Sequence, residues 1–575
     1  MVREDVIPNH LAIVLAGEAG SGVQSIETIV TRAFRRDGFH VFAGKEYMSR
    51  IRGGSNSTLI RVGTEPVRAW SDHVHLCIPL DEQAFAHVKK RLSPDSLVLG
   101  EQTVVGTGKS VVDLPLTAMA SEVGGALYAN TIAAGVIWGL FVRDPAILES
   151  VLQAYFADKP GDVIERNQRA ARMGIAHGQN LRISGKVPFA FPERPPKLLP
   201  LFMTGAEAVA LGAIAGGCNF VSSYPMSPST GVLTFLAQHA RELGIAVEQA
   251  EDEISAANMV LGAWYAGARG LATTSGGGFS LMTEAISLAG MIESPMVIHL
   301  AQRPGPATGL PTRTEQGDLE LALYAGHGEF PRALFAPGNI EQAFDLTRRG
   351  FDLADSFQVP VFILTDQYLM DSGYDVENFN LEQELYRPAI IQAKTDYRRY
   401  CLSSPDGLSP RGIPGWGEGL VCVDSDEHDE CAHITEDAEV RMSMVEKRRK
   451  KEKGLVSQVV PPDWYGSPEA EVVAICWGST LEPLLEAVLG LALPGLAVLH
   501  FSQVFPLPPQ GKFLPKKAQR LILVEGNASG QFGRLLKGEW EITWHARLLK
   551  YDGLPFSVEG LRDSLQKILR RKEQS

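Results

Sequence analysis

Three side chains that could orient a small acid follow three predicted strands in the middle of the chain. Ser227 lies in YPMSPST after the strand FVSSYP, Glu253 follows AVEQA, and Arg303 follows MVIHLAQ. Because ligands bind at the carboxyl ends of parallel strands, the hydroxyl, carboxylate and guanidinium are expected to converge at one sheet edge. Such a set can position a small oxoacid and a heterocycle.

Structural alternatives exist for the residues around these positions. Ser229 or Thr230 can cap the helix that follows YPMSP. The carboxylates of Glu248, Glu251 and Asp252 crowd another strand-to-helix junction, where the helix dipole alone can stabilise negative charge.

A Gly-rich turn near the N-terminus separates a predicted strand, AIVLA, from a helix. In this turn, GEAGSG, the backbone amides of Gly20, Ser21 and Gly22 can approach a phosphate. A nicotinamide site would need an acidic residue at the end of the next strand, and Glu46 in FHVFAGKEY fits that place poorly. The turn either binds another phosphate-bearing ligand or is only a tight turn without a ligand, and the sequence leaves both interpretations open.

A second loop, RIRGGSNS, combines two guanidinium groups with glycines and short polar side chains. Arg52, Gly53, Gly54 and Ser55 form its centre. Such a loop can bind an anion, and an exposed hairpin loop is the alternative.

The six cysteines are too scattered for a metal or iron–sulfur site. The closest pair, Cys422 and Cys431, lacks the short C-x-x-C spacing that presents two sulfurs to one centre. We therefore expect no cluster in this chain, and reduced, mostly buried thiols. The acidic segment DSDEHDE, with Asp426, His428 and Asp429, is interpreted as a solvated or salt-bridged loop rather than a metal site.

The elements that carry these residues alternate between strand and helix over most of the 575 residues. This pattern predicts the α/β class, and the length predicts several domains. We expect domains at 1–185, 203–385 and 469–575, joined by a proline-rich linker at 186–202 and a connector at 386–468 with one helix near 436–453. The middle domain is predicted to be a doubly wound parallel sheet.

Charge and hydropathy exclude other classes. The chain has 54 Lys and Arg against 67 Asp and Glu, which gives a net charge of −13. We therefore do not expect nucleic acid to be a partner. The longest apolar stretch, 132–142, is too short for a membrane span, and no export signal is seen. We expect a cytoplasmic protein that does not bind membranes.

Five motifs in order closely resemble the alpha subunit of 2-oxoacid:ferredoxin oxidoreductases. They are YPMSPST, EDEISAANMVLGAWYAGARGLATTSGGGFSLM, QRPGPATGLPTRTEQGD, DGLSPRGIPG with DEHDE, and VEGNASGQFGRLL. LAGEAGSGVQS and IRGGSNS resemble the family's gamma domain, here fused ahead of alpha. The layout is most similar to the members that use 2-oxoglutarate, the 2-oxoglutarate synthases. The family usually has Thr where Ser227 stands and Gly where Ala19 stands.

This resemblance implies three α/β domains: a gamma-type domain, the pyrimidine-binding domain of thiamine diphosphate enzymes, and a small domain like the transketolase C-terminal domain. Glu253 matches the carboxylate that hydrogen-bonds thiamine N1′. Ser227, Arg303 and Thr312 match positions that hold the oxoacid. Gly20, Ser21, Gly22 and the loop from Arg52 to Ser55 become candidates for coenzyme A.

The resemblance also implies a partner. The G-D-G motif with which the family holds the diphosphate and Mg²⁺ is missing from the sequence. A beta subunit is therefore expected to supply that site and a 4Fe–4S cluster, in an (αβ)₂ assembly that reduces ferredoxin. The implied reaction converts 2-oxoglutarate and CoA to succinyl-CoA and CO₂. Pyruvate or a branched-chain oxoacid is the alternative substrate. A non-catalytic thiamine-fold scaffold is the alternative of another class, and Glu253 argues against it.

Overall fold

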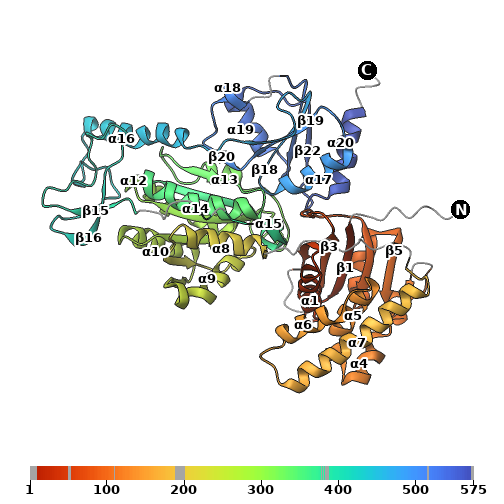
Figure 1. Ribbon diagram of the computed structural model, residues 1–575. Coiled ribbons are helices and arrows are strands. Elements are labelled where there is room, and N and C mark those ends of the chain that lie inside the picture. The colour runs from red at the N-terminus through yellow and green to blue at the C-terminus, as the bar shows by residue number, and fades with distance from the viewer. Residues whose placement is uncertain are drawn as a thin grey trace. The chain divides into compact units, whose positions relative to one another are not determined.

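The computed structural model describes residues 10–48, 54–108, 111–187, 189, 201–376, 378–379, 381, 388–513 and 517–570 (Figure 1). Contacts divide the chain into two compact units. The first holds 1–203, 372–378 and 557–560, and the second holds 204–371, 379–556 and 561–575. Helices pack on sheets in both units, which confirms the predicted α/β class.

The first unit is built on a mixed eight-stranded sheet in the order β6-β5-β4-β1-β3-β2-β14-β7. Its strands are β1 (His10–Glu18), β2 (His40–Glu46), β3 (Ser55–Gly63), β4 (Val74–Pro79), β5 (Leu92–Gly100), β6 (Val111–Asp113), β7 (Leu201–Thr204) and β14 (Gly373–Val376). β1 runs parallel to β4 and antiparallel to β3. β2 and β3 pair antiparallel, and Ser55, Asn56 and Ser57 of the segment RIRGGSNS belong to β3 itself.

Among the described residues, seven α-helices belong wholly to the first unit. They are α1 (Val23–Arg36), α2 (Glu82–Val88), α3 (Gln102–Val105), α4 (Leu116–Val123), α5 (Ala129–Leu140), α6 (Pro145–Tyr155) and α7 (Gly161–Ile183). α5 and α7 lie side by side (Figure 1) and touch through glycines. A Cβ added at Gly139 or Gly174 would overlap a backbone carbonyl of the other helix. The two helix axes can approach this closely only because side chains are absent there.

Within the described residues, no single helix has the length and apolar character of a membrane span. Leu116–Val123 and Ala126–Leu140 meet that criterion only when taken together, and they are bent by 112°.

The second unit contains a seven-stranded sheet in the order β20-β12-β13-β11-β10-β8-β9. Its strands are β8 (Phe220–Ser223), β9 (Ala246–Gln249), β10 (Gly270–Thr274), β11 (Met296–Gln302), β12 (Ala333–Phe335), β13 (Pro360–Asp366) and β20 (Gln503–Phe505). All neighbours are parallel except β20, which pairs antiparallel with β12. The predicted parallel sheet is therefore confirmed.

Helices connect these parallel strands. They are α8 (Gly205–Ala215), α9 (Thr230–Leu243), α10 (Glu253–Tyr265), α11 (Gly276–Leu281), α12 (Thr283–Met291), α13 (Leu319–Leu323), α14 (Ile340–Phe357) and α15 (Gln367–Asp371). α8 begins with a capping box in which the side chains of Thr204 and Glu207 bond each other's backbone amides.

A second, five-stranded sheet in this unit has the order β17-β19-β18-β21-β22. Its strands are β17 (Asp463–Tyr465), β18 (Val472–Trp477), β19 (Leu496–Phe501), β21 (Arg520–Glu525) and β22 (Ala546–Leu549). The remaining helices near it are α17 (Leu481–Leu491), α18 (Gln510–Phe513), α19 (Gln531–Trp540) and α20 (Val558–Arg570), whose first residues belong to the first unit.

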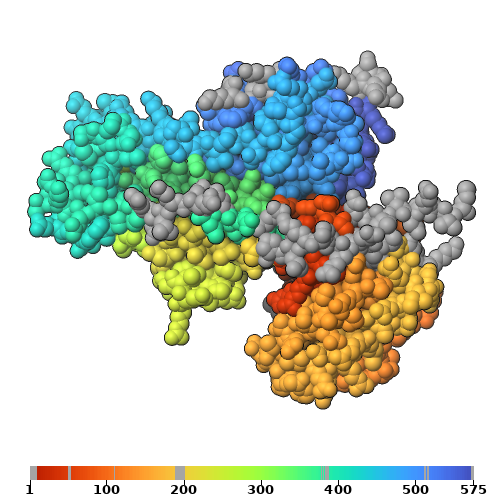
Figure 2. Space-filling model, in the orientation of Figure 1, coloured from red at the N-terminus to blue at the C-terminus, as the bar shows by residue number. Residues whose placement is uncertain are grey.

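A connector follows β14 in the sequence and contains β15 (Ile390–Ala393), β16 (Arg411–Gly417) and α16 (Ala438–Ser457). α16 is the helix predicted near 436–453. Figure 2 shows the connector, in teal, as a compact lobe of the second unit. Its small core contains Tyr400, Ala432 and Met444.

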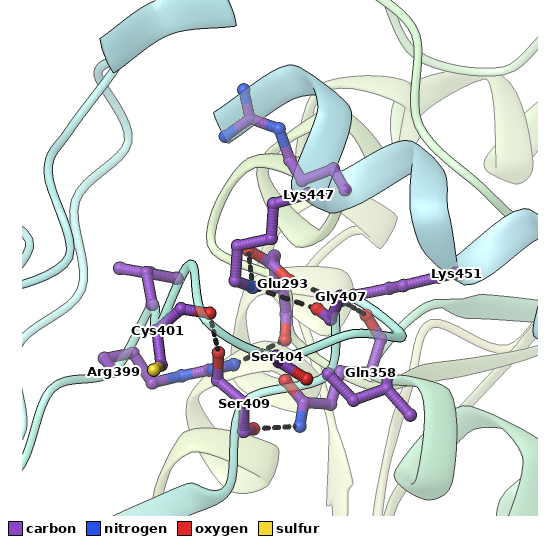
Figure 3. A network of polar contacts seen from close by, with 12 residues as sticks. Glu293, Gln358, Arg399, Cys401, Ser404, Gly407, Ser409, Lys447 and Lys451 are labelled. Atoms are coloured by element: carbon purple, nitrogen blue, oxygen red, sulfur yellow. Dashed lines mark hydrogen bonds and ion pairs between the residues drawn. The ribbon is translucent and has the colours of Figure 1, made fainter. Parts of the chain in front are cut away.

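Buried charges fasten the connector to the loop after α12 (Figure 3). The Glu293 carboxylate lies 2.8 Å from Lys447 Nζ and 2.5 Å from Lys451 Nζ, both on α16. Arg399 donates to the Glu293 carbonyl at 2.7 Å. All four residues are at most 4% exposed, so the buried cations depend on the Glu293 carboxylate for compensation, and the carboxylate depends on them.

Candidate functional site

The candidate site lies at the carboxyl edge of the seven-stranded sheet. Ser227 follows β8, Glu253 follows β9, and Arg303 follows β11 directly. β10 lies between β8 and β11 in the sheet and leads into Ser275 and Gly276. Because these strands are parallel, their following loops all emerge at the same edge, as predicted.

Arg303 joins two of these loops. Its Nη1 donates to the Ser227 carbonyl oxygen at 2.8 Å. Its Nε is excluded from solvent and has no hydrogen-bond partner. Burial lowers the pKa of Arg303, while the nearby carboxyls of Asp318 and Glu253 act in the opposite direction. The guanidinium is thus held in place with a donor unused.

Glu253 is the first residue of α10, and the preceding Asp252 caps that helix by accepting from Ser255 N at 2.8 Å. The Glu253 side chain is buried, and its Oε1 has no hydrogen-bond partner. Burial is the main reason that the pKa of Glu253 is raised above its usual value. A buried carboxyl with a raised pKa and a vacant oxygen can exchange a proton with a ring nitrogen placed beside it.

Gly278 forms one wall beside this carboxyl. A Cβ at Gly278 would overlap both Glu253 Oε1 and Thr274 Oγ1. A Cβ at Gly276 would overlap the carboxyl of Asp318 in the same way. The Gly-rich segment after β10 therefore has no room for side chains next to two carboxyls.

Ser227 and Thr312 complete the predicted substrate residues. Ser227 is exposed, and Thr312 is half-buried in the loop that runs from Arg303 to Asp318. The structure brings Ser227, Glu253 and Arg303 together and puts Thr312 in the same loop as Arg303. Ser229 stands at the start of α9, but its hydroxyl donates to the Met226 carbonyl rather than capping the helix.

Gln316, which sequence analysis did not single out, anchors this loop to the five-stranded sheet. Its Nε2 donates to Trp477 O at 2.9 Å, and its Oε1 accepts from Gly526 N at 2.8 Å and from Thr480 Oγ1 at 3.1 Å. Asn527 Nδ2 donates to the Gln316 carbonyl at 2.9 Å. The motifs TEQGD and VEGNASG, more than 200 residues apart, thus interlock.

Asp318 was also missed. It is half-buried beside Gly276, and its Oδ2 has no hydrogen-bond partner. Among the sequence features, only its place at the end of GLPTRTEQGD could have drawn attention to it.

The Gly-rich turn of the first unit has the backbone that the sequence suggested. Gly20 and Gly22 have positive φ of 89° and 86°, a region that glycine adopts without strain. Ser21 Oγ is excluded from solvent without a partner. A Cβ at Gly22 would overlap the side-chain amide of Asn130, a neighbour that sequence analysis missed.

The second loop reaches this turn. Ala19 N donates to the Gly54 carbonyl at 3.3 Å, and the buried Ser55 Oγ also has no hydrogen-bond partner. Arg52 and Gly53 lie outside the described residues. Two unused hydroxyls and a strand-to-helix turn can together receive a phosphate.

The segment DSDEHDE forms a salt-bridged loop. Glu427 pairs with Arg441 and Arg448, and His428 stacks on Tyr400 with ring centroids 4.0 Å apart. Within the described parts of the chain, no group of three or more His, Cys, Asp or Glu side chains could hold a metal ion.

Comparison with protein families gives two matches along the chain. Residues 12–177 match the family "pyruvate ferredoxin/flavodoxin oxidoreductase". Residues 211–447 match the thiamine diphosphate-binding domain of pyruvate flavodoxin/ferredoxin oxidoreductases.

Individual similar proteins match most of the chain or nearly all of it. The alpha subunit of 2-oxoacid:ferredoxin oxidoreductase 2 from Aeropyrum pernix is 30% identical over 98% of both chains. The 2-oxoglutarate oxidoreductase subunit KorA from Mycobacterium tuberculosis is 29% identical over 76% of this chain and 68% of its own. A solved structure of 2-oxoglutarate:ferredoxin oxidoreductase from Magnetococcus marinus, with 2-oxoglutarate, coenzyme A and succinyl-CoA bound, matches with a TM-score of 0.90. It is 28% identical and covers 98% of this chain and 100% of its own.

Proposed function

The chain belongs to the 2-oxoacid:ferredoxin oxidoreductase family as an alpha subunit, and from this premise we propose its specific reaction. With a beta subunit, it converts 2-oxoglutarate, CoA and two oxidised ferredoxins to succinyl-CoA, CO₂, one proton and two ferredoxins that each gain one electron. The observation that carries the proposal is the unpartnered Oε1 of Glu253 beside Gly278, with Arg303 fixed on the Ser227 loop.

Thiamine diphosphate fits the residues around Glu253. The vacant Oε1 offers one hydrogen bond to an aminopyrimidine nitrogen, and the absence of a Cβ at Gly276 and Gly278 lets the two carboxyls keep their positions. When bound, thiamine diphosphate supplies the carbon nucleophile and accepts the electron pair that decarboxylation leaves behind. Glu253 gives and takes the proton at the ring nitrogen, which its raised pKa favours.

Arg303 and Ser227 orient the oxoacid. The guanidinium has an unused Nε–H for a carboxylate oxygen, and the exposed Ser227 hydroxyl can donate to a carbonyl. Thr312 supplies a further hydroxyl from the loop that Gln316 holds. Positioning by these groups fixes the carbonyl carbon before it is attacked.

CoA is assigned to the first unit. Gly20, Ser21 and Gly22 form the strand-to-helix turn that Gly54 contacts, and Ser21 and Ser55 offer two unpartnered hydroxyls for its phosphates. Arg52 and Gly53, from the same loop, are proposed to add charge. The beta subunit supplies the diphosphate site with Mg²⁺ and the 4Fe–4S cluster, and the assembly is (αβ)₂.

The choice of 2-oxoglutarate is supported by the 2-oxoglutarate enzymes among the similar proteins. The test uses the chain co-purified with its partner subunit. It measures the CoA-dependent reduction of a viologen dye with 2-oxoglutarate, pyruvate or a branched-chain oxoacid as the substrate. We expect the highest kcat/KM with 2-oxoglutarate. A higher value with another oxoacid would transfer the assignment to that substrate, and no reaction with any of them would favour the scaffold alternative.

A variant separates the CoA assignment from the rest. Arg52→Ala should raise the CoA requirement by a factor of about 10 or more, as expected when a charge-assisted hydrogen bond of about 1.5–3 kcal/mol is lost. Decarboxylation measured without CoA should hardly change. The exposed Arg169→Ala on α7 is the matched control. An unchanged CoA requirement would place CoA elsewhere.

A further inference from the structure

We propose that Asp318 is a titrating positioning residue: as a neutral acid it leaves the charge of Arg303 to the oxoacid carboxylate, and as a carboxylate it competes for that charge. This inference rests on the proposed function. It gives the site a proton-controlled affinity for its acidic substrate.

Hydrogen bonds fix Asp318 at the end of β11. Its backbone N donates to Gln302 Oε1 at 3.0 Å, and Gln302 Nε2 donates to Thr365 O on β13 at 3.1 Å. Gln302 is the residue immediately before Arg303, and it is 1% exposed. Asp318 is therefore attached to the same strand end as the guanidinium that it is proposed to control.

The carboxyl of Asp318 points to Gly276. A Cβ added there would lie 2.7 Å from Asp318 Cγ, so the glycine leaves just enough room for the acid. Asp318 Oδ2 and Arg303 Nε are both excluded from solvent, and neither has a hydrogen-bond partner. Burying an unpaired acceptor and an unpaired donor near one strand end costs folding free energy, which indicates that the two groups serve a function.

Burial, together with one neighbouring carboxyl, brings the pKa of Asp318 near neutrality. Burial and the nearby Glu315 raise the pKa of Asp318 to about 7, while Arg303 acts to lower it. Arg303 comes from the end of β11 and Glu315 from the same loop as Asp318, and Glu253, at the start of α10, acts on Arg303 as well. Below pH 7 the acid is mainly neutral, and above it the added negative charge opposes a bound carboxylate.

The consequence is a pH-dependent KM in the assembled enzyme. Between pH 6 and pH 8.5, the KM for 2-oxoglutarate should rise by a factor of about 5, as expected for one added charge within a few ångströms of the anion at high effective dielectric. Asp318→Asn cannot ionise, so its KM should stay flat over this range. The inhibition constant of N-oxalylglycine, an unreactive analogue of 2-oxoglutarate, should follow the same two patterns.

Glu315→Gln is the second variant. Removing this carboxylate lowers the pKa of Asp318, so the rise in KM should move to lower pH and keep its size. A merely structural change would not shift the profile along the pH axis.

Three outcomes would overturn the inference. The first is a KM profile of Asp318→Asn that rises in parallel with wild type. If Asp318→Asn is inactive, the second outcome decides: a pH profile of KM for Glu315→Gln that coincides with that of the wild type. The third is a wild-type complex that binds neither 2-oxoglutarate nor its analogue, which would overturn the proposed substrate too, whereas the first two leave that substrate intact.

Discussion

Glu253 carries the proton chemistry proposed for the site, and its substitution tests that role. Glu253→Gln keeps the size of the side chain and one hydrogen bond but cannot exchange the proton, so turnover should fall by about 10² or more. Turnover of the assembled complex, measured at equal thiamine diphosphate occupancy, checks this. The neighbouring exposed Glu251→Gln is the control. Near-wild-type turnover with full cofactor occupancy would contradict the role.

Gly278 protects the position of that carboxyl. Gly278→Ala places a methyl group where it overlaps Glu253 Oε1, so the carboxyl must move. We expect turnover to fall by at least a factor of about 10, because small displacements of catalytic groups are costly. Gly277→Ala is a matched control, since its Cβ would meet only the Ala307 carbonyl at 3.8 Å. Equal effects of the two substitutions would mean that the segment acts only through its backbone.

Local signals explain which site residues the sequence could predict. Arg303 follows its strand directly, and Ser227 and Glu253 come within four residues of theirs, so the strand pattern and the rule for parallel sheets place them at one edge. Asp318 and Gln316 have no such signal, because their partners are brought in by folding. Gln316, for example, bonds Trp477 and Gly526, which only the tertiary structure places beside it.

At the scale of elements, the attachment of α16 depends on one buried carboxylate. Although burial alone would raise the pKa of Glu293, Lys451, Lys447 and Arg399 lower it to about 2. The paired carboxylate therefore contributes stability above its usual pKa of 4.5, and that contribution is lost as the pH falls toward 2.

Glu293→Gln should thus destabilise the chain strongly near neutral pH. Removing one partner of a buried ion network typically costs about 3–5 kcal/mol. Thermal unfolding at pH 7 and at lower pH measures this, and the gap to wild type should narrow below pH 4.5. Glu446→Gln, exposed on the same helix, should leave the unfolding temperature nearly unchanged. A constant gap at all pH values would rule out an electrostatic origin.

The contact between α5 and α7 depends on glycine in a similar way. Gly174→Ala would drive a methyl group into the Ile132 carbonyl, and overpacking of this kind costs about 1–3 kcal/mol. Gly161→Ala, in the first turn of the same helix, meets nothing within 4 Å and should be neutral or stabilising. The unfolding temperatures of the two variants test this prediction. Similar values would show that the helices can move apart without a loss of stability.

Element type was easier to predict than strand partnership. The apolar and charged patterns placed α16 and the central strands correctly, because each pattern is contained in one segment. β14 and β20 could not be assigned to their sheets this way. β14 joins β2 and β20 joins β12 across intervals of more than 150 residues, and a short strand carries no mark of its distant partner.

The whole chain is expected to be catalytically incomplete. Its six cysteines lack iron–sulfur spacing, so the purified chain alone should contain no stoichiometric iron and should oxidise no oxoacid. Metal analysis and dye reduction, before and after addition of the beta subunit, measure both. Iron bound at one equivalent or more by the chain alone would contradict the expectation that the beta subunit holds the iron–sulfur cluster.

Because the chain passes several times between its two units, proteolytic cleavage at one point does not separate them. The chain passes from one unit to the other at 203/204, 371/372, 378/379, 556/557 and 560/561. A single engineered protease site between residues 190 and 200 would therefore sever the polypeptide without releasing the first unit, since β14 still pairs with β2 and Val558 N still donates to Trp70 O. A denaturing gel would show two fragments where native chromatography shows one particle. A gene truncated at that point would encode a sheet that lacks β14 and β7 and exposes β2 as a bare edge prone to aggregation.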